Sequence, residues 1–399
     1  MQYLEEILQP EVQAFIRDHA HHDPYALTLQ AQKYSHLPIQ SIAEQIGARQ
    51  KARYKLPEWY QTDAIVFPPG IPLEQSSSEI TAKYKSTLVN GGQLIDLTGG
   101  MGVDTFYLSH SFQQTDYVEQ NTELATLTRH NFQALGQPGI QVHTDTAEHF
   151  LQNWQGKADV IYLDPDRRAE HAHKVFRLAD ASPNVLALIG HLIQKADTTL
   201  IKTSPLLDID LAIQNLRFVR KVYVVAVDND CKEVLYLLRA GETLSPEITA
   251  VNLSAKGKMV QEFSFTRAQE ATAVVNYARP MQYIYEPNAA VLKAGAFKAV
   301  AIHYNLQKLH PNSHLYTSTH QVPSFPGRSF KVHHSCTYNK RLLRKLLPEG
   351  NANISVRNFP DTVDMIRKKL GLKESKNTYL LATTGPDNKP IVLICEKVS

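Results

Sequence analysis

The chain has 399 residues, of which 43% are hydrophobic and 20% charged, and its formal net charge is +3 at pH 7. This length predicts two to four domains, and the composition is that of an ordinary soluble protein rather than a disordered or fibrous one. Acids in the first seven residues, the absence of a long apolar run and three widely separated cysteines argue against a secretory signal, a membrane span and a metal or disulfide framework, so we expect a cytoplasmic protein.

The beginning of the chain has the residue spacing of helices. Apolar residues recur at helical intervals over Tyr3–Ile16, and further helices are expected around Ala26–Leu29 and Ile42–Ile46. Phe67–Pro72 contains three prolines and a glycine, which predicts a linker. We therefore predict a helical N-terminal domain over residues 1–72.

Strands and helices alternate over residues 73–242. The expected strands are Leu94–Leu97, Tyr117–Glu119, Gln141–Asp145, Val160–Asp164 and Thr199–Thr203. The expected helices are Glu79–Leu88, with Ser77 or Ser78 as N-cap, Glu123–Leu135 and Asn184–Lys195. This alternation predicts an α/β fold with a Rossmann-like, mainly parallel sheet. The spacing between Lys221–Val227 and Val234–Arg239 is too short for a helical crossover, so an antiparallel hairpin should close the sheet.

The first of these strands runs into a glycine turn and then into a helix near Asp104. Gly99, Gly100 and Gly102 can take positive φ and let a ligand approach the backbone, and the unpaired amides of the next turn suit a carboxylate or phosphate. Open parallel sheets hold nucleotide-like cofactors at such a turn. Asp96 precedes the turn and Asp104 follows it, a pair that would repel a pyrophosphate and attract the cationic groups of S-adenosylmethionine.

Acids also end the following strands. Glu119 is placed to bind both ribose hydroxyls of an adenosine, a role that fits NAD equally well. Asp145 is placed to bind an adenine amino group, and the fourth strand ends in Asp164-Pro165-Asp166. The alternative is an ordinary strand–helix turn with unrelated acids at strand ends. Four consecutive strand tips with suitable groups favour the methyl donor.

These motifs resemble the class I S-adenosylmethionine-dependent methyltransferases, and more narrowly a bacterial family that ends in a ferredoxin-like segment and a THUMP-like domain. The matching stretches are residues 74–85, 96–104, 164–168, 202–205, 285–295 and about the last 70. The resemblance implies a methyl-donor fold joined to an RNA-binding tail, but it does not carry over a substrate. Thr98 stands where the general motif has glycine, a replacement also found in RNA-directed members, and we include it in the donor site.

The Asp-Pro-Asp-Arg-Arg stretch falls where class I enzymes place the acceptor. In base-amino methyltransferases an Asp/Asn-Pro-Pro-aromatic stretch holds the exocyclic amine in line with the methyl group. Asp164 is expected in that role, with Asp166 to share it or to accept the proton. No aromatic residue follows. Arg167 and Arg168 stand there and either contact the substrate or only neutralise the two acids. Lys202, at the end of the fifth strand, is either a further acceptor-site residue or a solvated lysine.

After residue 242 the pattern of expected helices and strands changes. A hairpin is expected over Ile248–Phe265, a helix from Asn288 to about Ala299, and we place a small ferredoxin-like α+β segment at 243–325. A THUMP-like domain is expected at 326–399, with strands Phe330–His334, Ala352–Arg357, Tyr379–Thr383 and Pro390–Glu396 and helices Asn339–Leu347 and Thr362–Leu370. This last part has 14 Lys and Arg against 6 Asp and Glu, whereas the other 325 residues have 28 against 33.

The basic tail favours contact with a polyanion, the alternative being a charge that only serves solubility. Lys340, Arg341, Arg344 and Lys345 share one or two faces of a helix. The histidines at 19, 21, 22, 171 and 173 lack metal-ligand spacing, so no metal is expected. The leading hypothesis is therefore a methyltransferase that acts on RNA at a base amino group or another base nitrogen. The alternatives are a donor-binding RNA adaptor without turnover and a methyltransferase of a small molecule.

Overall fold

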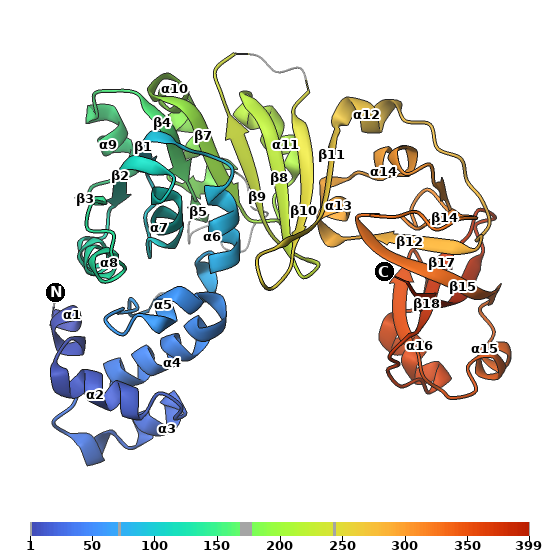
Figure 1. Ribbon diagram of the computed structural model, residues 1–399, viewed down its shortest axis with the longest axis horizontal. Helices are drawn as coiled ribbons and strands as arrows, with labels where there is room; N and C mark the ends of the chain where they lie inside the picture. Colours follow the sequence, from blue (N-terminus) through green and yellow to red (C-terminus); the bar gives the residue numbers. More distant parts are fainter. Residues whose placement is uncertain (1, 71–72, 168–177, 242–244, 399) are drawn as a thin grey trace. The chain divides into compact units, whose positions relative to one another are not determined.

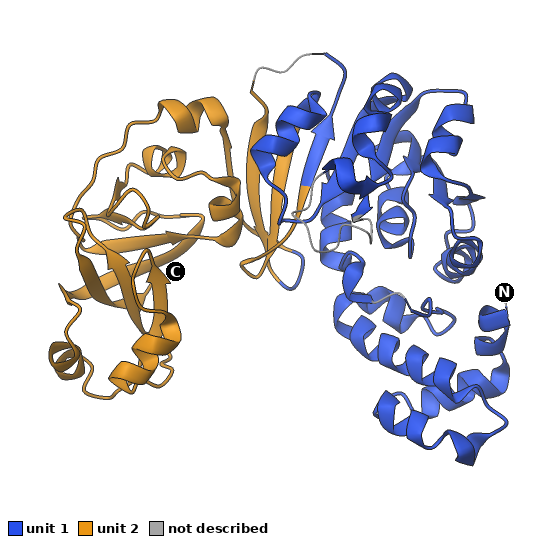
Figure 2. Ribbon diagram, turned by 180° about the vertical axis from the view of Figure 1, so that it is seen from behind, with its two compact units in different colours: residues 1–220, 235–243, 255–257 blue, residues 221–234, 244–254, 258–399 orange. Residues whose placement is uncertain are grey.

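The structure is a computed structural model that describes residues 2–70, 73–167, 178–241 and 245–398 (Figure 1). The chain divides into two compact units. Unit 1 comprises residues 1–220, 235–243 and 255–257, and unit 2 comprises residues 221–234, 244–254 and 258–399 (Figure 2). Within the described residues, no helix is long and apolar enough to cross a membrane.

Unit 1 begins with short helices, as the sequence predicts. They are α1 (Gln2–Ile7), α2 (Pro10–Asp18), α3 (Pro24–Leu29), the 3-10 turn η1 (Ala31–Tyr34), α4 (Ile39–Lys55) and α5 (Pro57–Gln61). Three of them begin at a proline, whose fixed φ and missing amide suit the first helical position. Their apolar faces form a small core around Ile16, Ile42 and Ile46. The expected helix around Ile42 is a much longer one.

The next helix, α6 (Glu79–Ser86), follows the turn η2 (Leu73–Gln75). Of the two candidate caps, Ser78 is the N-cap, since its hydroxyl accepts the Thr81 amide at 3.2 Å. The Ser77 hydroxyl instead donates to Asp104 at 2.7 Å. Ser78 therefore caps the helix and Ser77 binds Asp104, a difference that the sequence pattern does not reveal.

The predicted Rossmann-like sheet is confirmed. Its described strands run in the order β11-β10-β8-β9-β7-β4-β1-β2-β3. The bounds are β1 (Gly91–Asp96), β2 (Phe112–Glu119), β3 (Gln141–Thr144), β4 (Ala158–Leu163), β7 (Ala196–Thr203), β8 (Val219–Val227), β9 (Asp230–Leu238), β10 (Glu247–Leu253) and β11 (Met259–Thr266). β1 pairs in parallel with β2 and β4, β2 with β3, and β4 with β7. The carboxyl ends of these strands therefore share one edge of the sheet.

Helices connect the parallel strands, as a doubly wound sheet requires. They are α7 (Val103–Ser109), α8 (Thr122–Ala134), α9 (Ala147–Asn153), α10 (Val185–Lys195) and α11 (Ile209–Leu216). A two-stranded ribbon of β5 (Asp166–Arg167) and β6 (Ala181–Ser182), with the turn η4 (Leu178–Asp180), follows β4. The predicted hairpin is β8 and β9, but it does not close the sheet, because β10 pairs in parallel with β8 and β11 forms the edge. Its turn has two residues rather than six, because Asp228 and Asn229 both take positive φ.

Unit 2 contains a second sheet, of seven described strands in the order β13-β14-β12-β15-β18-β17-β16. The bounds after β11 are α12 (Arg267–Thr272), β12 (Tyr283–Pro287), α13 (Ala289–Ala294), α14 (Ala299–His303), β13 (Gln307–Lys308), β14 (Tyr316–Ser318), β15 (Gly327–Thr337), α15 (Lys340–Leu346), β16 (Asn353–Arg357), α16 (Val363–Leu370), β17 (Thr378–Thr384) and β18 (Pro390–Lys397). The predicted order of the tail elements is confirmed, but β12 pairs with β15, so one sheet runs through both predicted C-terminal segments.

One expectation for unit 2 needs correction. The single helix expected from Asn288 to about Ala299 is two helices, because Gly295 ends α13 in the left-handed conformation with φ +76°. Glu286, at the end of β12, connects three strands of the second sheet. It is 2% exposed and pairs with Arg328 and Arg357, and so fastens β12 to β15 and β16.

Candidate functional site

The predicted donor residues gather at the carboxyl edge of β1, β2, β3 and β4. The parallel register brings the loop after β1 between the ends of its two neighbours. A cavity of about 110 Å³ lies there, lined by Thr98, Gly100, Glu119, Asp145, Asp164 and Asp166 together with Leu97, Val118, Gln120, Ala147, Glu148, Ser182 and Pro183. Ligand pockets usually measure ~300–1,000 Å³, so a nucleoside bound here must extend beyond this cavity.

Asp96 organises the loop from beneath. Its side chain is 1% exposed, one carboxylate oxygen accepts the Thr98 amide at 2.9 Å, and the other accepts the Thr105 hydroxyl at 2.6 Å. Burial raises the pKa of Asp96 to about 7, more than the hydroxyl and amide bonds lower it, and the charge of Asp104 raises it further. Asp96 therefore carries only part of its negative charge at neutral pH.

Asp104 lies in a buried network. One carboxylate oxygen accepts the hydroxyls of Ser77 and Tyr162, each at 2.7 Å, and the other lies 3.1 Å from the ammonium of Lys85. The Lys85 side chain is fully buried and also donates to Ser77 at 3.1 Å. Burial alone would raise the pKa of Asp104, but the charges of Lys85 and Lys202 and the two hydroxyls lower it. Asp104 is therefore ionised, and Lys85 balances its charge.

The glycines of the turn differ in what they make possible. Gly100 and Gly102 take positive φ, of 53° and 77°, as expected, whereas Gly99 does not. Gly99 is needed for another reason, because a Cβ there would lie 2.2 Å from the ring of Tyr117. A Cβ on Gly100 would meet only a backbone oxygen, 3.8 Å away. Gly100 is thus the glycine of the turn at which the backbone is open to a ligand.

Two acids at the ends of β2 and β3 also line the cavity. Glu119 accepts the amides of Gly100 at 3.0 Å and Asn121 at 2.8 Å, one on each oxygen. A carboxylate oxygen accepts two hydrogen bonds, so each retains capacity for a ligand hydroxyl. Asp145 is held from outside by the ring of His149, whose Nδ1 lies 2.8 Å from Oδ2. The structure therefore brings Glu119 and Asp145 together with the glycine turn.

Thr98 connects the donor loop to the Asp-Pro turn. Its hydroxyl oxygen accepts the amide of Asp164 at 2.6 Å and lies 3.3 Å from Asp96 Oδ1, to which it donates. A glycine, which the general motif has at this position, could make neither bond. The departure from the motif therefore holds the two parts of the site in a fixed relation.

The three predicted acceptor residues at the ends of β4 and β7 lie close together. Lys202 forms an ion pair with Asp164, and the side chains are 13% and 30% exposed. Asp166 lines the same cavity. Desolvation and then the negative charge of Asp164 raise the pKa of Asp166. The pair of acids thus consists of one carboxylate paired with a lysine and one whose pKa is raised.

Comparison with solved structures identifies the family. The chain matches the crystal structure of a "putative methyltransferase" from Porphyromonas gingivalis W83 with 33% sequence identity and a TM-score of 0.87, over 99% of each chain. Residues 283–326 match a family model described as a ferredoxin-like domain, and residues 327–397 one described as THUMP domain-like. The chain belongs to this family of methyltransferases with ferredoxin-like and THUMP-like C-terminal segments.

Other matches are weaker. A structure titled as a methyltransferase of Streptococcus mutans in complex with SAH is 16% identical, with a TM-score of 0.31 over 40% of this chain and 95% of the other. A modification subunit of a type I restriction enzyme from Vibrio vulnificus YJ016 is 10% identical, with a TM-score of 0.36 over 51% and 57%. With TM-scores this low, neither similarity is evidence for the function of the chain. No curated protein sequence matches the chain.

Sequence reasoning missed the residues that support the site from behind. Lys85, Ser77 and Tyr162 around Asp104 and His149 beside Asp145 were not among the predicted site residues. One signal was available for Lys85. It lies on the same face of α6 as Thr81 and Ala82, which are buried, so a lysine there needs a buried acid as partner.

The two predicted arginines differ in what the structure describes. Arg167 belongs to β5, whereas Arg168, like His171 and His173, lies outside the described residues. Whether the arginines contact substrate or only neutralise the acids stays a prediction. In the parts of the chain that the structure describes, no group of three or more histidine, cysteine or acidic residues is arranged to hold a metal ion.

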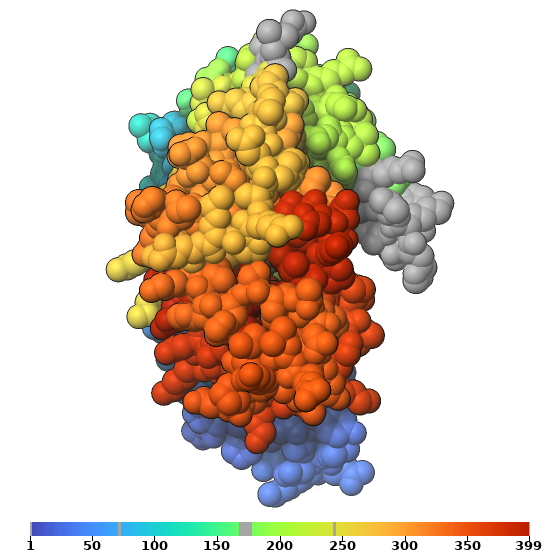
Figure 3. All heavy atoms as spheres, turned by 90° about the vertical axis from the view of Figure 1, so that its right-hand side faces the viewer, coloured from blue at the N-terminus to red at the C-terminus, as the bar shows by residue number. Residues whose placement is uncertain are grey.

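The THUMP-like segment presents its basic residues to solvent. Figure 3 shows atoms of this segment, in orange to red, on the surface turned toward the viewer. Lys340, Arg341, Arg344 and Lys345 of α15 are all exposed, and none forms an ion pair with another described residue. In α16, by contrast, Lys369 is 3.5 Å from Asp361 and lies over the ring of Tyr338. α15 therefore carries four exposed cations without an ion pair to a described residue.

Proposed function

We propose that the protein is an S-adenosylmethionine-dependent methyltransferase that acts on RNA, at an amino group or another nitrogen of a base. One observation supports this most directly. The Thr98 hydroxyl joins the glycine loop to the Asp164 backbone, so a donor-binding loop and an acceptor-binding turn are held at one edge of the sheet. That arrangement serves a transfer between two bound molecules, because rate comes largely from positioning the two reacting atoms.

The donor-side residues suit a nucleoside that carries a positive charge. Glu119 would bind the ribose hydroxyls, Asp145 the adenine amino group, and the backbone at Gly100 would lie against the ligand. Thr98, Gly99, Gly102 and Asp104 would contribute by fixing the loop rather than by direct contact. Asp96 would supply negative charge when it is ionised. The donor, when bound, supplies a methyl group on a positively charged sulfur.

On the acceptor side, the two acids would have separate tasks. Asp164, oriented by Lys202, would accept a hydrogen bond from the amine of the base. Asp166 would accept the proton that the amine loses, since an acid with a raised pKa binds a proton more readily near neutral pH. Arg167 and Arg168 would bind a phosphate or stack on the base in place of the missing aromatic residue.

The RNA proposal rests on the THUMP-like segment and on the unpaired cations of α15. Phosphate contacts by lysine and arginine provide most of the affinity of non-specific nucleic-acid binding. RNA from a strain that lacks the gene, compared with wild-type RNA by mass spectrometry of nucleosides, should lack one methylated nucleoside. Unchanged RNA would redirect the proposal to a small-molecule acceptor.

Donor binding is tested separately by titration calorimetry of the full-length protein with S-adenosylmethionine. Wild type should bind, and Asp96→Ala should bind more weakly because it removes both the loop anchor and the charge. Asp197→Ala is the matched control, since Asp197 is 61% exposed near the start of β7 and does not line the cavity. No heat with wild-type protein would end the donor proposal.

A second candidate is an RNA adaptor that binds the donor without turnover. It is favoured by the ion pair between Asp164 and Lys202, which occupies the acid that the motif offers to a substrate. Asp164→Ala separates the two. Loss of methyl transfer with RNA binding retained supports the enzyme, whereas tight RNA binding with no transfer in wild type, and no effect of Asp164→Ala, supports the adaptor.

A further inference from the structure

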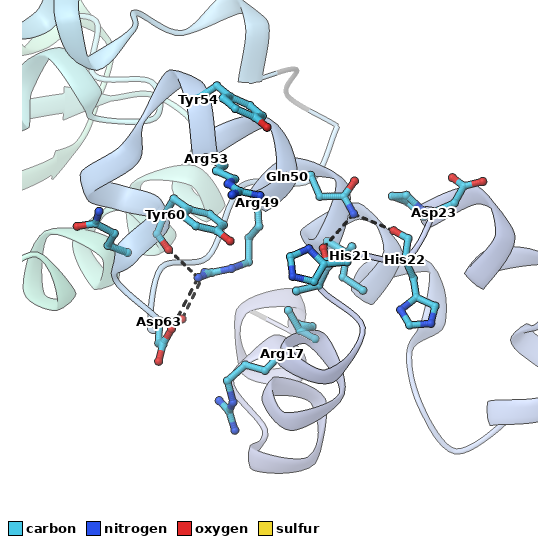
Figure 4. Close-up of a pocket in the computed structure, with 15 residues that line it drawn as sticks. Arg17, His21, His22, Asp23, Arg49, Gln50, Arg53, Tyr54, Tyr60 and Asp63 are labelled. Carbon is cyan, nitrogen blue, oxygen red and sulfur yellow. Dashed lines mark hydrogen bonds and ion pairs between the residues drawn. The ribbon is translucent and has the colours of Figure 1, made fainter. Parts of the chain in front are cut away.

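A cleft of about 690 Å³ lies in the helical region at the beginning of unit 1, apart from the donor cavity. It is enclosed by α2, the loop between α2 and α3, the second half of α4, and α5 with the residues that follow it (Figure 4). Its polar lining consists of Arg17, His21, His22, Asp23, Arg49, Gln50, Arg53, Tyr54, Tyr60, Gln61 and Asp63. Such a volume and such side chains are unusual for a simple packing defect.

Two residues of α4 hold the walls of the cleft in place. Arg49 donates to the carbonyls of Tyr60 at 3.0 Å and Ile65 at 3.4 Å, and its guanidinium lies over the Tyr60 ring at 5.7 Å. Gln50 donates to the carbonyls of Ala20 at 3.0 Å and His22 at 2.8 Å. These bonds tie α5 and the loop between α2 and α3 to one helix. The cleft is thus a fixed feature of the helical region.

Two other arginines remain available. Arg53 lies one helical turn after Arg49, and Arg17 lies on α2 across the cleft (Figure 4). Neither forms an ion pair with any residue that the structure describes, and both are exposed. The Arg53 guanidinium lies over the ring of Tyr54 at 5.8 Å, and Tyr54 is 81% exposed. Unpaired guanidinium groups beside an exposed aromatic ring can bind a phosphate and a base together.

The basic residues of α4 are divided by face. Lys51 is paired with Glu74 at 2.7 Å, and Lys55 donates to the carbonyls of Leu73 and Glu74 at 2.8 and 2.7 Å, so that side of the helix holds the η2 turn. Arg53, on the cleft side, has no such partner. Arg53 therefore differs from Lys51 and Lys55 in two ways. It has no ion-pair partner, and it lies in a cleft beside an aromatic ring, an arrangement that solubility alone does not require.

We propose that this cleft binds a single-stranded segment of RNA, with Arg17 and Arg53 on phosphates and the Tyr54 ring stacked on a base. The inference rests on the proposed function as an RNA methyltransferase, and it adds a contact surface outside the basic THUMP-like segment. The two acids of the cleft do not oppose it. Asp23 caps α3, and Asp63 is 3.9 Å from Arg49, so neither faces the RNA as an isolated charge.

The test uses the full-length protein and a fluorescein-labelled oligouridylate of about 12 nucleotides, with binding followed by anisotropy. Arg17→Ala/Arg53→Ala should weaken binding about tenfold and reduce the slope of log Kd against log salt by between about one and two. Tyr54→Ala should weaken it at least about fivefold. Lys51→Ala and Tyr25→Ala should stay within about twofold of wild type, the first because Lys51 is already paired and the second because Tyr25, although 72% exposed, lies outside the cleft.

Location is tested with the same RNA carrying 4-thiouridine, by photo-crosslinking and peptide mapping, with thermal unfolding to verify that each variant is folded. Crosslinks in residues 17–23 or 49–63 support the cleft. If the cleft variants bind like wild type while reversal of the α15 cations abolishes binding, the cleft inference is wrong and the proposed function stands. If Lys51→Ala weakens binding as much as the double variant, general charge explains the effect and the cleft has no role. If wild type binds no RNA, both proposals are overturned.

Discussion

The acids that flank the glycine turn and the acids at the neighbouring strand tips have different surroundings. Asp96 and Asp104 are buried, and their oxygens are occupied by amides, hydroxyls and a lysine. Glu119, Asp145 and Asp166 border an open cavity. An acid that lies close to the glycine motif in the sequence therefore need not have a carboxylate that a ligand can reach. The flanking acids mainly hold the loop in place, whereas the strand-tip acids line the cavity in which we propose that the donor binds.

The largest expected effect tests the buried pair. Lys85→Met should lower the free energy of unfolding by about 3–5 kcal/mol, because it leaves the buried Asp104 carboxylate without its cation. Urea unfolding measures this. The double variant Lys85→Met/Asp104→Asn should recover about half of the loss, since no uncompensated charge remains. A loss below about 1 kcal/mol in the single variant would show that the pair does not hold the loop.

The next effect tests the open acids. Asp166→Asn should lower methyl transfer about 10²-fold while donor affinity changes by less than about twofold. A base acts when deprotonated, so wild-type turnover should fall as pH drops through the raised pKa of Asp166. The variant should lack this step in its pH profile. Equal loss of donor binding would instead place Asp166 on the donor side.

Gly99 and Gly100 allow the packing of the loop to be tested separately from its contact with a ligand. Gly99→Ala should destabilise folding by about 1–3 kcal/mol, because its Cβ would overlap the Tyr117 ring. Gly100→Ala should cost about 1 kcal/mol, for a positive φ alone, and should weaken donor binding more than Gly99→Ala does. Thermal unfolding and calorimetry on both variants test the ranking. The reverse order would exchange their roles.

The smallest effect concerns Asp96, a buried acid that anchors the donor loop. Its pKa is about 7 in the free protein, and a bound cation favours the charged form, so donor binding should release a proton. Affinity should then rise about tenfold from pH 6 to pH 8 in wild type and stay nearly flat in Asp96→Asn. Calorimetry in buffers of different ionisation enthalpy detects the proton directly. A flat wild-type profile would mean that Asp96 does not sense the donor.

The raised pKa of Asp96 also predicts how the free energy of unfolding depends on pH. Between pH 4 and pH 7 the folded protein holds a proton on Asp96 that the unfolded chain has lost, because the pKa is raised from 3.8 to about 7. The free energy of unfolding contributed by this group therefore falls as pH rises through that range. Asp96→Asn removes this dependence, so its stability relative to wild type should increase from pH 4 to pH 7.

Much of the fold could be predicted from local pattern. Parallel strands with intervening helices were expected at β1, β2, β3, β4 and β7, since periodicity and turn residues are local properties. The boundaries were less accurate. The two-residue turn at Asp228 and Asn229 and the division of a helix at Gly295 depend on positive φ, which apolar periodicity does not report.

By itself, the sequence determined the order of the elements, the glycine turn and the acids at the strand tips, because these follow from neighbours along the chain. Only the tertiary structure decided which acids are open and which are occupied. Ser77 and Lys85, just before and within α6, and Tyr162 of β4 meet Asp104 from two distant segments, and the walls of the N-terminal cleft come from α2, α4 and α5. Burial and pairing between distant residues set the charge of a group, and no local pattern contains that information.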